Sequence, residues 1–353
     1  MKKKTKKLKI FLWTIAILGL IRIALPSIVK VSLNNYLENF SPSIKAQVSD
    51  VDMAIIRGSY KLKGIKANVK KSDRPFLVVD AVTASLSWKD LLSGQITSNV
   101  LIQKADMIYT ENLIPAVKEH LARVDVTKEV KEEAKKSLFK VPRLDVVNSS
   151  VSTDIFPSLT KEDGTILNSL NARITNLIPS EESQMSPFNL NGEILGTGDL
   201  KVEGELDLYA DVPNWTVDTE ILHFDMTSLN KFLKEKVPLT FTRGELDLYA
   251  EAKSQGGPIV GYLKPFVKSL DVMKEEEEFE GTGHWFIEII SALGNITMKS
   301  DEVMATKIPF TFDKKLKVDT GETISKAMTH GFTQEQSRGI ENSIGLKQSQ
   351  EEK

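Results

Sequence analysis

Apolar and polar residues alternate at every second position along most of the chain after residue 46. Such alternation is typical of an amphipathic strand, because successive side chains of a strand point to opposite faces of the sheet. In the segment 79–88, the shared apolar face is predicted to carry Val82, Ala84, Leu86 and Trp88. We count about a dozen such segments, with a few short helical ones between them. The pattern predicts a mainly β protein with short helices, of the α+β class.

Two glycines interrupt this alternation in a way that indicates β-bulges. Upstream of Gly64 the apolar residues occupy even positions, and downstream of it they occupy odd positions. The opposite change, from odd to even, takes place at Gly244. One extra residue in a strand swaps its two faces. We therefore predict a bulge at each glycine.

The heptapeptide GELDLYA occurs twice, at 204–210 and at 244–250. In an extended strand each copy places its aliphatic residues on one face, and these residues are Leu206, Leu208, Ala210, Leu246, Leu248 and Ala250. The other face carries a glutamate, an aspartate and a tyrosine in each copy. If the copies were neighbouring strands, the four carboxylates would converge on a calcium site or a glycosidase-like pair. We favour a solvated acidic face opposite the apolar face.

The N-terminal pattern predicts a helix that crosses a membrane. After a basic tail at 1–7, the segment 8–29 is apolar apart from Lys9 and Arg22, and spans about 33 Å as a helix, against a bilayer core of about 30 Å. The residues that anchor it are Phe11, Trp13, Leu18 and Ile21. We interpret it as an uncleaved signal anchor with a cytoplasmic N-terminus, because the lysines precede the span. After Pro26, apolar residues at three- and four-residue spacing predict an amphipathic helix over 30–42, docked on the body.

Composition and charge narrow the possible functions. The chain has 353 residues and no cysteine, so thiol nucleophiles, disulfides and cysteine-based zinc sites are excluded. All 48 acidic residues but only 39 of the 46 basic residues lie outside 2–22, which gives the body an acidic balance. A body of that sign has no general attraction to nucleic acid.

We find no pattern that indicates catalysis, a metal or a cofactor. The four histidines, His120, His223, His284 and His330, have no metal-ligand spacing. The chain has no nucleophile elbow, phosphate-binding loop or calcium-binding loop. We therefore expect no catalytic residue, no metal, no cofactor and no nucleic-acid partner. The polar segment 321–353 is expected to be a C-terminal helix or a flexible tail.

Several stretches resemble the AsmA-like proteins, which are anchored in the inner membrane of bacteria. The similar stretches are RIALPSIVKVSLNNYL, IIRGSYKLKGI, RPFLVVDAVTASLSWKDLLSGQI, DMTSLNKFLKE, RGELDLYAEAKSQGGPIVGYLKPFVKSLDV and VMATKIPF. The chain is similar to a branch described only as a domain of unknown function, within the wider repeating β-groove superfamily of lipid-transfer proteins. The resemblance covers most of the chain and has no catalytic signature.

This resemblance implies an extended, curled antiparallel β-sheet groove over 43–320, following the transmembrane helix, with an apolar concave face. It also implies a single-pass protein of the bacterial inner membrane, with its body in the periplasm. The expected partners are the membrane, a phospholipid or another lipid, and proteins of the envelope. The expected function is non-enzymatic lipid binding or guidance in outer-membrane biogenesis. The alternatives are a scaffold that receives partners by strand addition and, less favoured, a hydrolase that uses the repeated carboxylates.

Overall fold

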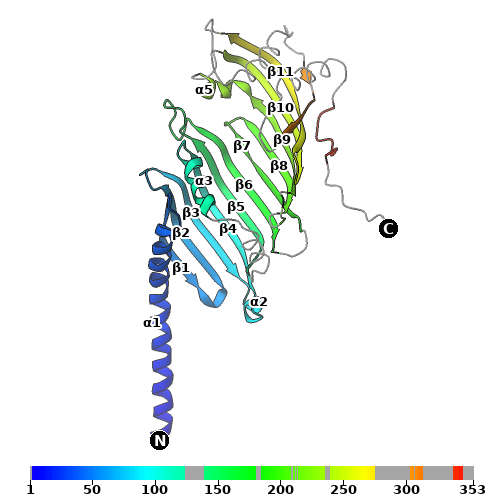
Figure 1. The fold of residues 1–353 in the computed structure, drawn as a ribbon. Helices are drawn as coiled ribbons and strands as arrows, with labels where there is room; N and C mark the ends of the chain where they lie inside the picture. The colour runs from blue at the N-terminus through cyan, green and yellow to red at the C-terminus, as the bar shows by residue number, and fades with distance from the viewer. Residues whose placement is uncertain are drawn as a thin grey trace, which may run out of the picture.

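The fold is that of a computed structural model of the chain (Figure 1). The structure describes residues 2–123, 139–179, 184–207, 210, 212, 214–234, 239–274, 303–305, 307–312 and 337–344. In the first half of the N-terminal helix it describes the backbone and, of the side chains before Arg22, only that of Trp13.

Strands make up most of the described chain. They are β1 (Ile44–Ala54), β2 (Ser59–Val69), β3 (Pro75–Leu86), β4 (Ile96–Tyr109), β5 (Phe139–Thr153), β6 (Thr165–Leu177), β7 (Ser186–Ile194), β8 (Gly198–Asp207), β9 (Asn214–Asp225), β10 (Leu239–Gln255), β11 (Ile259–Lys274), β12 (Val303–Ala305) and β13 (Ile308–Phe312). The α-helices are α1 (Lys2–Asn39), α2 (Trp88–Leu92), α3 (Leu113–Arg123) and α5 (Asn230–Leu233), and the 3-10 helices are η1 (Ile55–Arg57) and η2 (Met226–Leu229). The predicted class, mainly β with short helices, is confirmed.

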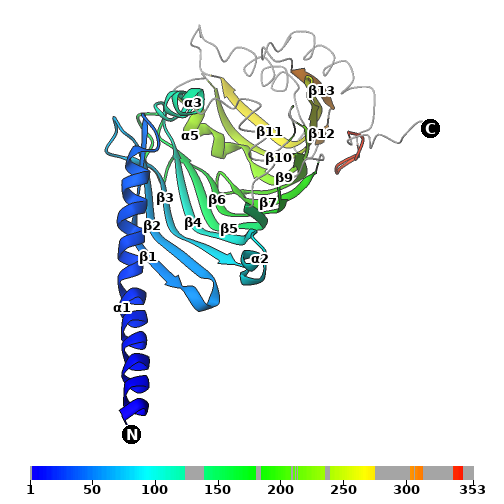
Figure 2. The ribbon, with the colours of Figure 1, turned by 60° about the horizontal axis from the view of Figure 1, so that its bottom comes forward.

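Within the described residues, one sheet contains all thirteen strands in the order of the chain, with β13 beside β12 on β11. It curls into a trough that does not close on itself (Figure 2). The prediction of an antiparallel sheet is wrong at one pair, because β4 and β5 are parallel. The strand β4 ends near α3, whereas Phe139, the first residue of β5, lies beside Ile96 at the other end of the sheet. A chain that returns to that end before pairing again must run parallel.

Neither predicted bulge adds a net residue to its strand. At Gly244 the pairing of β10 with β11 is irregular between Phe241 and Glu245, but Phe241 pairs with Val272 and Glu245 with Lys268, so the two shifts cancel. At Gly64 the pairing with β1 and with β3 continues without a shift, so an extra residue there is wrong.

The parity change at Gly64 is nevertheless real, and it belongs to the whole sheet. Gly64 has a left-handed backbone, with φ 57°, and Lys104 on β4 and Asn148 on β5 have the same conformation. On β1, Val48 and Val51 are both buried although they lie three positions apart, which simple alternation does not give. Apolar residues therefore move from one alternate set of positions to the other at the same height on each of these neighbouring strands. The pairing register between the strands is unchanged.

The helix α1 continues through Pro26, so a single helix carries both the predicted anchor and the predicted amphipathic segment. Its last turns dock on the body, as predicted. The Asn34 side chain accepts a hydrogen bond from the Val48 N–H (2.7 Å) and donates one to the Val48 carbonyl (3.0 Å). These bonds cover the backbone of the edge strand β1, where unpaired groups would invite another strand.

Among the side chains that the structure describes, no helix is long and apolar enough to cross a membrane. Trp13 is exposed. The side chains of Phe11, Leu18 and Ile21 lie outside the described residues, so the predicted anchor stays a prediction.

Two helical segments pack on the same face of the sheet, at one end. The segment formed by η2 and α5 contributes Met226, Leu229 and Leu233 to a core with Phe224, Phe241 and other residues of β9 to β11. The helix α3 contributes Ala116 and Val117 to a second core with Phe40 and residues of β1 to β3. Both segments fill one end of the trough.

Replacement of Gly64 by alanine tests the sheet-wide change of faces. A Cβ at this position would lie 2.6 Å from Ser49 Oγ, in a backbone conformation that costs an L residue energy. We expect Gly64→Ala to lower the free energy of unfolding by about 1–3 kcal/mol, as measured by chemical denaturation. Gly257→Ala is the control, because no atom lies within 4 Å of the added Cβ. Equal stability of the two variants would contradict the interpretation.

Candidate functional site: the apolar concave face

The register of the sheet aligns uncharged and almost entirely apolar residues into two continuous rows that cross the strands. The first row contains Val51, Leu62, Val82, Ile102, Val146, Ala172, Leu190, Val202, Thr219, Ala250, Leu263 and Ile308. The second contains Met53, Tyr60, Ala84, Val100, Leu144, Ile174, Phe188, Gly204, Val217, Ala252, Gly261 and Phe310. We call these the inner rows. Neither contains a charged residue.

The row between them, on the opposite face, has the opposite character. This outer row contains Asp52, Lys61, Thr83, Leu101, Asp145, Arg173, Asn189, Glu203, Asp218, Glu251, Tyr262 and Pro309. Ion pairs join some of its members, such as Arg173 Nε and Asp145 (2.7 Å). The sheet therefore has one apolar and one polar face.

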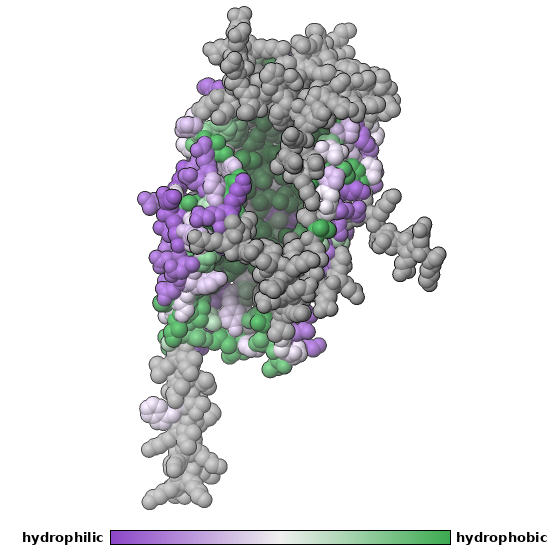
Figure 3. Space-filling view, in the orientation of Figure 1, coloured by the Kyte–Doolittle hydropathy of each residue, from purple (hydrophilic) through white to green (hydrophobic). Residues whose placement is uncertain are grey.

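The apolar face lines a hollow. Figure 3 shows a depression with hydrophobic residues along its floor and polar residues at its margins. Most side chains of the inner rows are only partly buried, and Leu263 is exposed. A core closed by the protein's own side chains would bury these residues more completely. The face is therefore an apolar surface that stays partly accessible.

Glycines within the second inner row make room for aromatic rings. A Cβ on Gly204 would lie 2.7 Å from Cζ of Phe188, and one on Gly261 would lie 2.5 Å from Cζ of Phe310. Each ring thus lies over the backbone of the neighbouring strand. The rings broaden the apolar floor where the glycines contribute no side chain of their own.

The predicted groove residues have three outcomes. Val82, Leu248 and Ala250 lie in strands at positions on the apolar face. Leu86, Leu206 and Leu246 are an even number of positions from residues of that face on the same strands, so they lie on it as well. Leu208 lies outside the described residues. Two predictions are wrong, because Trp88 and Ala210 lie beyond the ends of their strands.

The two misplaced residues have local reasons for leaving the strand. The strand β3 ends at Leu86, and Trp88 begins α2, which the Ser87 hydroxyl caps by accepting the Asp90 N–H. The Ala210 N–H donates to Asp207 Oδ1 (3.0 Å), an aspartate turn of the kind that competes with the strand.

The two copies of GELDLYA therefore have different structures. In the second copy all seven residues lie inside β10, whereas β8 ends within the first copy, at Asp207. The residues that follow differ, since Pro213 lies shortly after the first copy and Glu251-Ala252-Lys253 continue the second. The neighbourhood decides how far an identical sequence stays extended.

The carboxylates of the two copies do not converge. The strand β9 separates β8 from β10, and Asn214 on β9 pairs with both Asp207 and Gln255. Gln255 lies about 26 Å along β10 from Asp247, at about 3.3 Å per residue. Among the described residues no group of three or more acidic or histidine side chains is arranged to hold a metal.

The prediction of a solvated acidic face is wrong for the aspartate of each copy, because Asp207 is 7% exposed and Asp247 is 4% exposed. The Asp247 carboxylate forms an ion pair with Arg338 and accepts the His223 N–H (2.9 Å). Residues 337–344, which we call the C-terminal clasp, cover this part of the outer face. Where the sequence suggests a helix or a flexible tail, the described part of the segment is a docked strap.

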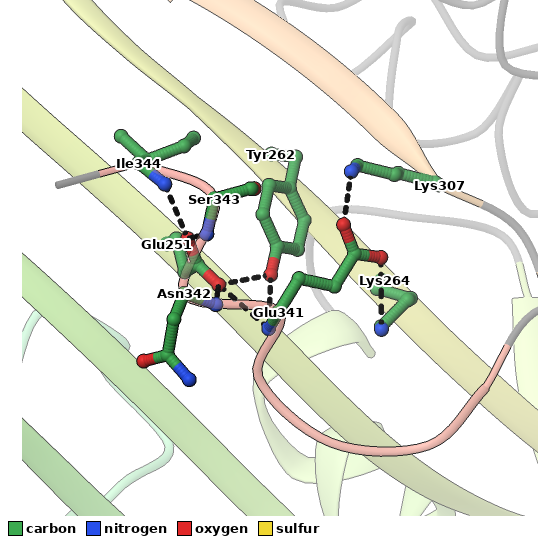
Figure 4. Close-up of polar contacts among 8 residues, drawn as sticks. All are labelled: Glu251, Tyr262, Lys264, Lys307, Glu341, Asn342, Ser343 and Ile344. Carbon is green, nitrogen blue, oxygen red and sulfur yellow. Dashed lines mark hydrogen bonds and ion pairs between the residues drawn. The ribbon is translucent and has the colours of Figure 1, made fainter.

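The central contact of the clasp is the carboxylate of Glu251, which is 1% exposed. One oxygen accepts the N–H groups of Glu341 (2.7 Å) and Asn342 (2.6 Å), and the other accepts those of Ser343 and Ile344 (both 2.9 Å) (Figure 4). The Tyr262 hydroxyl, across the strand pair, donates to the first oxygen at 2.5 Å. Five donors thus compensate the burial of one negative charge.

Glu341 of the clasp forms ion pairs with two lysines. The Lys264 ammonium, whose side chain is 0% exposed, lies 3.1 Å from Glu341 Oε1, and Lys307 binds the other oxygen at 2.5 Å (Figure 4). A buried lysine without a partner would be strongly destabilising. Glu341 therefore links β11 to the residue that precedes β13.

These contacts shift the acid–base equilibria in the clasp. Burial alone would raise the pKa of the Glu251 carboxyl, but the hydrogen bonds from Tyr262 and from the clasp backbone outweigh it and hold this pKa below its usual range. Hydrogen bonds from Lys307, and then from Lys264, likewise lower the pKa of Glu341 against the effect of burial. Burial, and then the nearby Glu251, Glu203 and Glu220, raise the pKa of Asp218.

The sequence does not predict the clasp, because the residue pattern of β10 would be the same whether or not a segment covered its outer face. Alternating Glu245, Asp247, Tyr249 and Glu251 is typical of a solvated face. The partners Arg338 and Glu341 lie in a polar segment without periodicity. Only the contact in the structure between Glu251 and Asn342, which are about 90 residues apart in the chain, identifies the clasp.

Comparison with known proteins adds no relative. No protein-family model matches the chain, and no curated protein matches its sequence.

Replacement of Glu251 by glutamine tests the clasp. A glutamine offers one acceptor oxygen for four backbone N–H groups and turns an NH2 group toward some of them. We expect Glu251→Gln to lower the free energy of unfolding by about 2–4 kcal/mol and to accelerate hydrogen exchange of the amides at 341–344. Glu205→Gln, an exposed position on the same face, is the control. Unchanged exchange at 341–344 would contradict the assignment.

The clasp also predicts a pH dependence. A carboxyl whose pKa is lower in the folded than in the unfolded state stabilises the fold above the unfolded pKa, about 4.3 for glutamate. That stabilisation is lost as the pH falls through the folded value. Detachment of residues 337–344 should therefore precede global unfolding in an acid titration followed by hydrogen exchange, and Glu251→Gln should flatten the titration. Detachment of residues 337–344 when the pH is raised from 5 to 8 would contradict this pH dependence.

Proposed function

We propose that this protein is a membrane-anchored, non-enzymatic protein of the bacterial envelope whose concave sheet face binds or guides lipid acyl chains. The anchor is the predicted span at 8–29, in the inner membrane, and the body lies in the periplasm. A phospholipid or another envelope lipid is the proposed cargo, and outer-membrane biogenesis is the proposed context.

The observation that carries this proposal is the pair of inner rows. They cross the described sheet from β1 to β13 without a charge, while the outer row between them is polar. A sheet with one solvated face usually packs its apolar face on a core. Here that face stays partly accessible, as Leu263 and Met107 illustrate, so it suits a long apolar ligand.

The energetics favour acyl chains over a flat polar ligand. Transfer of each CH2 group from water to an apolar surface contributes about 0.8 kcal/mol. A chain of about 16 carbons that lay along the inner rows would therefore gain on the order of 10 kcal/mol before the loss of its mobility. Neither inner row offers a charged group for a headgroup, which suits a ligand held by its tail.

Strand addition by a protein partner has less support. The free edge of β1 is covered by α1, because Asn34 bonds to both backbone groups of Val48. Hydrolysis by the repeated carboxylates has no geometric support either, since the two copies lie far apart. Both alternatives are therefore secondary to lipid binding.

The size of the sheet limits the role. About a dozen strands at about 4.8 Å extend roughly 60 Å along the sheet. This length holds a few lipids, and is short for a bridge across a whole envelope. Holding or loading lipid near the anchoring membrane is therefore the favoured mode.

A matched pair of charge substitutions on β3 tests the proposal. Ala84 belongs to an inner row, and the adjacent Ser85 points to the opposite face and is exposed. A carboxylate among acyl chains costs several kcal/mol, so Ala84→Asp should reduce the lipid that co-purifies with the full chain at least tenfold. Ser85→Asp places the same charge on the same strand and should retain the lipid.

Mass spectrometry of extracted lipid measures the occupancy, and circular dichroism checks that both variants fold. Wild-type protein purified from membranes without bound lipid would contradict the proposal. Equal lipid content in the two variants would contradict the assignment of the inner rows as the binding surface.

A further inference from the structure

Large apolar side chains are exposed at one end of the sheet. Ile56 in η1 is 86% exposed, and Leu92 in α2 is 88% exposed. The remaining exposed members at this end are Trp88, Leu91, Ile96 and Val212. We call these six residues the apolar rim.

The topology places the rim residues together. The helix η1 connects β1 to β2, and α2 connects β3 to β4 at the same end of the sheet, where the Leu86 N–H donates to the Gly58 carbonyl (2.7 Å). Val212 lies between β8 and β9, whose connection is at this end as well. Figures 1 and 2 show α2 and the β1–β2 connection at the end opposite α3 and α5.

The helix α1 extends toward and beyond this same end (Figures 1 and 2). Asn34 lies beside Val48, and β1 runs from there to Ile56 over about 26 Å at about 3.3 Å per residue. An α-helix covers that length in about 17 residues at about 1.5 Å each. The rim is therefore level with about residue 17 of α1, or with a later residue where β1 is inclined to the helix, and so with a part of the predicted span 8–29. The N-terminal part, with its lysines, projects past the rim.

The residues beside the rim suit an anionic surface. Arg57 follows Ile56 directly and Lys89 follows Trp88, and both cations are exposed. Asp90 is the acidic residue of the same short helix. Apolar side chains at turns, a tryptophan and neighbouring cations are the composition of segments that enter the headgroup region of a membrane.

We propose that the apolar rim inserts into the leaflet that faces the body, in the bilayer that anchors α1, and that it holds the adjoining end of the inner rows at the membrane. This inference rests on the membrane anchor of the proposed function. The opposite end, which α3 and α5 pack against, then faces away from the bilayer. Lipid enters or leaves the concave face at the rim.

The absence of cysteine allows a direct test with single nitroxide labels. Leu92→Cys and, separately, Ile56→Cys report on the rim, and Met273→Cys reports on an exposed position at the far end of β11. The labelled full chain is reconstituted into phosphatidylcholine vesicles that contain phosphatidylglycerol. Electron paramagnetic resonance then compares relaxation by oxygen, which concentrates in lipid, with relaxation by a water-soluble nickel chelate.

We expect both rim labels to be shielded from the nickel chelate several-fold more strongly in vesicles than in detergent, and the Met273→Cys label to stay in water. Rim labels in water, on protein that floats with the vesicles, would overturn the proposal while leaving the anchor intact. Failure of the chain to float with vesicles would overturn the anchor and the rim together. Concentration-dependent shielding in detergent would assign the rim to contact between copies instead.

Lipid occupancy of the inner rows is measured independently by Ala84→Asp. A rim in water together with a lipid-filled concave face would therefore reject only the rim.

Discussion

The backbone register of the sheet is the constraint on which the rest of the structure depends. Apolar residues on a single strand form a stripe only a few side chains long, and they form a surface only if neighbouring stripes coincide. Left-handed residues on β2, β4 and β5 preserve this coincidence, because the strands change faces at the same level. A slip of one residue in any pair would place outer residues such as Arg173 among the apolar residues of the next strand. The concave face is thus a property of the pairing.

Much of the architecture follows from local pattern, and the remainder depends on contacts that no local pattern contains. Two-residue alternation identifies the strands and the apolar face of Val82 and Leu248, and the change of alternation at Gly244 identifies a place where the pairing of β10 with β11 is irregular. The sequence around Gly64 reveals a change of faces, but only the neighbouring strands show that the register is kept. The parallel pair of β4 and β5 depends on the path of a connection. The identical heptapeptides diverge because turn-forming residues follow only the first.

Electrostatics on the outer face explain why the clasp forms where it does. Glu203, Asp218 and Glu251 are cross-strand neighbours, and burial, together with the repulsion between these carboxylates, raises the pKa of Asp218. Neighbouring carboxylates repel one another, so the binding of a segment that supplies hydrogen-bond donors to them is favoured. The clasp brings Arg338 to Asp247 and four N–H groups to Glu251. Polar contacts thus complete one face of the sheet, whereas the apolar face stays partly accessible.

The most direct measurement is photocrosslinking of the full chain, in membranes, to a phospholipid with a diazirine on its acyl chain. Crosslinked residues are then assigned by mass spectrometry. Lipid binding on the concave face predicts labelling of Val82 and Leu190, and of other members of the inner rows, with a period of two residues along each strand. Their neighbours Thr83 and Asn189 should remain unlabelled. Labelling without this alternation, or labelling confined to α1, would contradict a lipid-binding concave face.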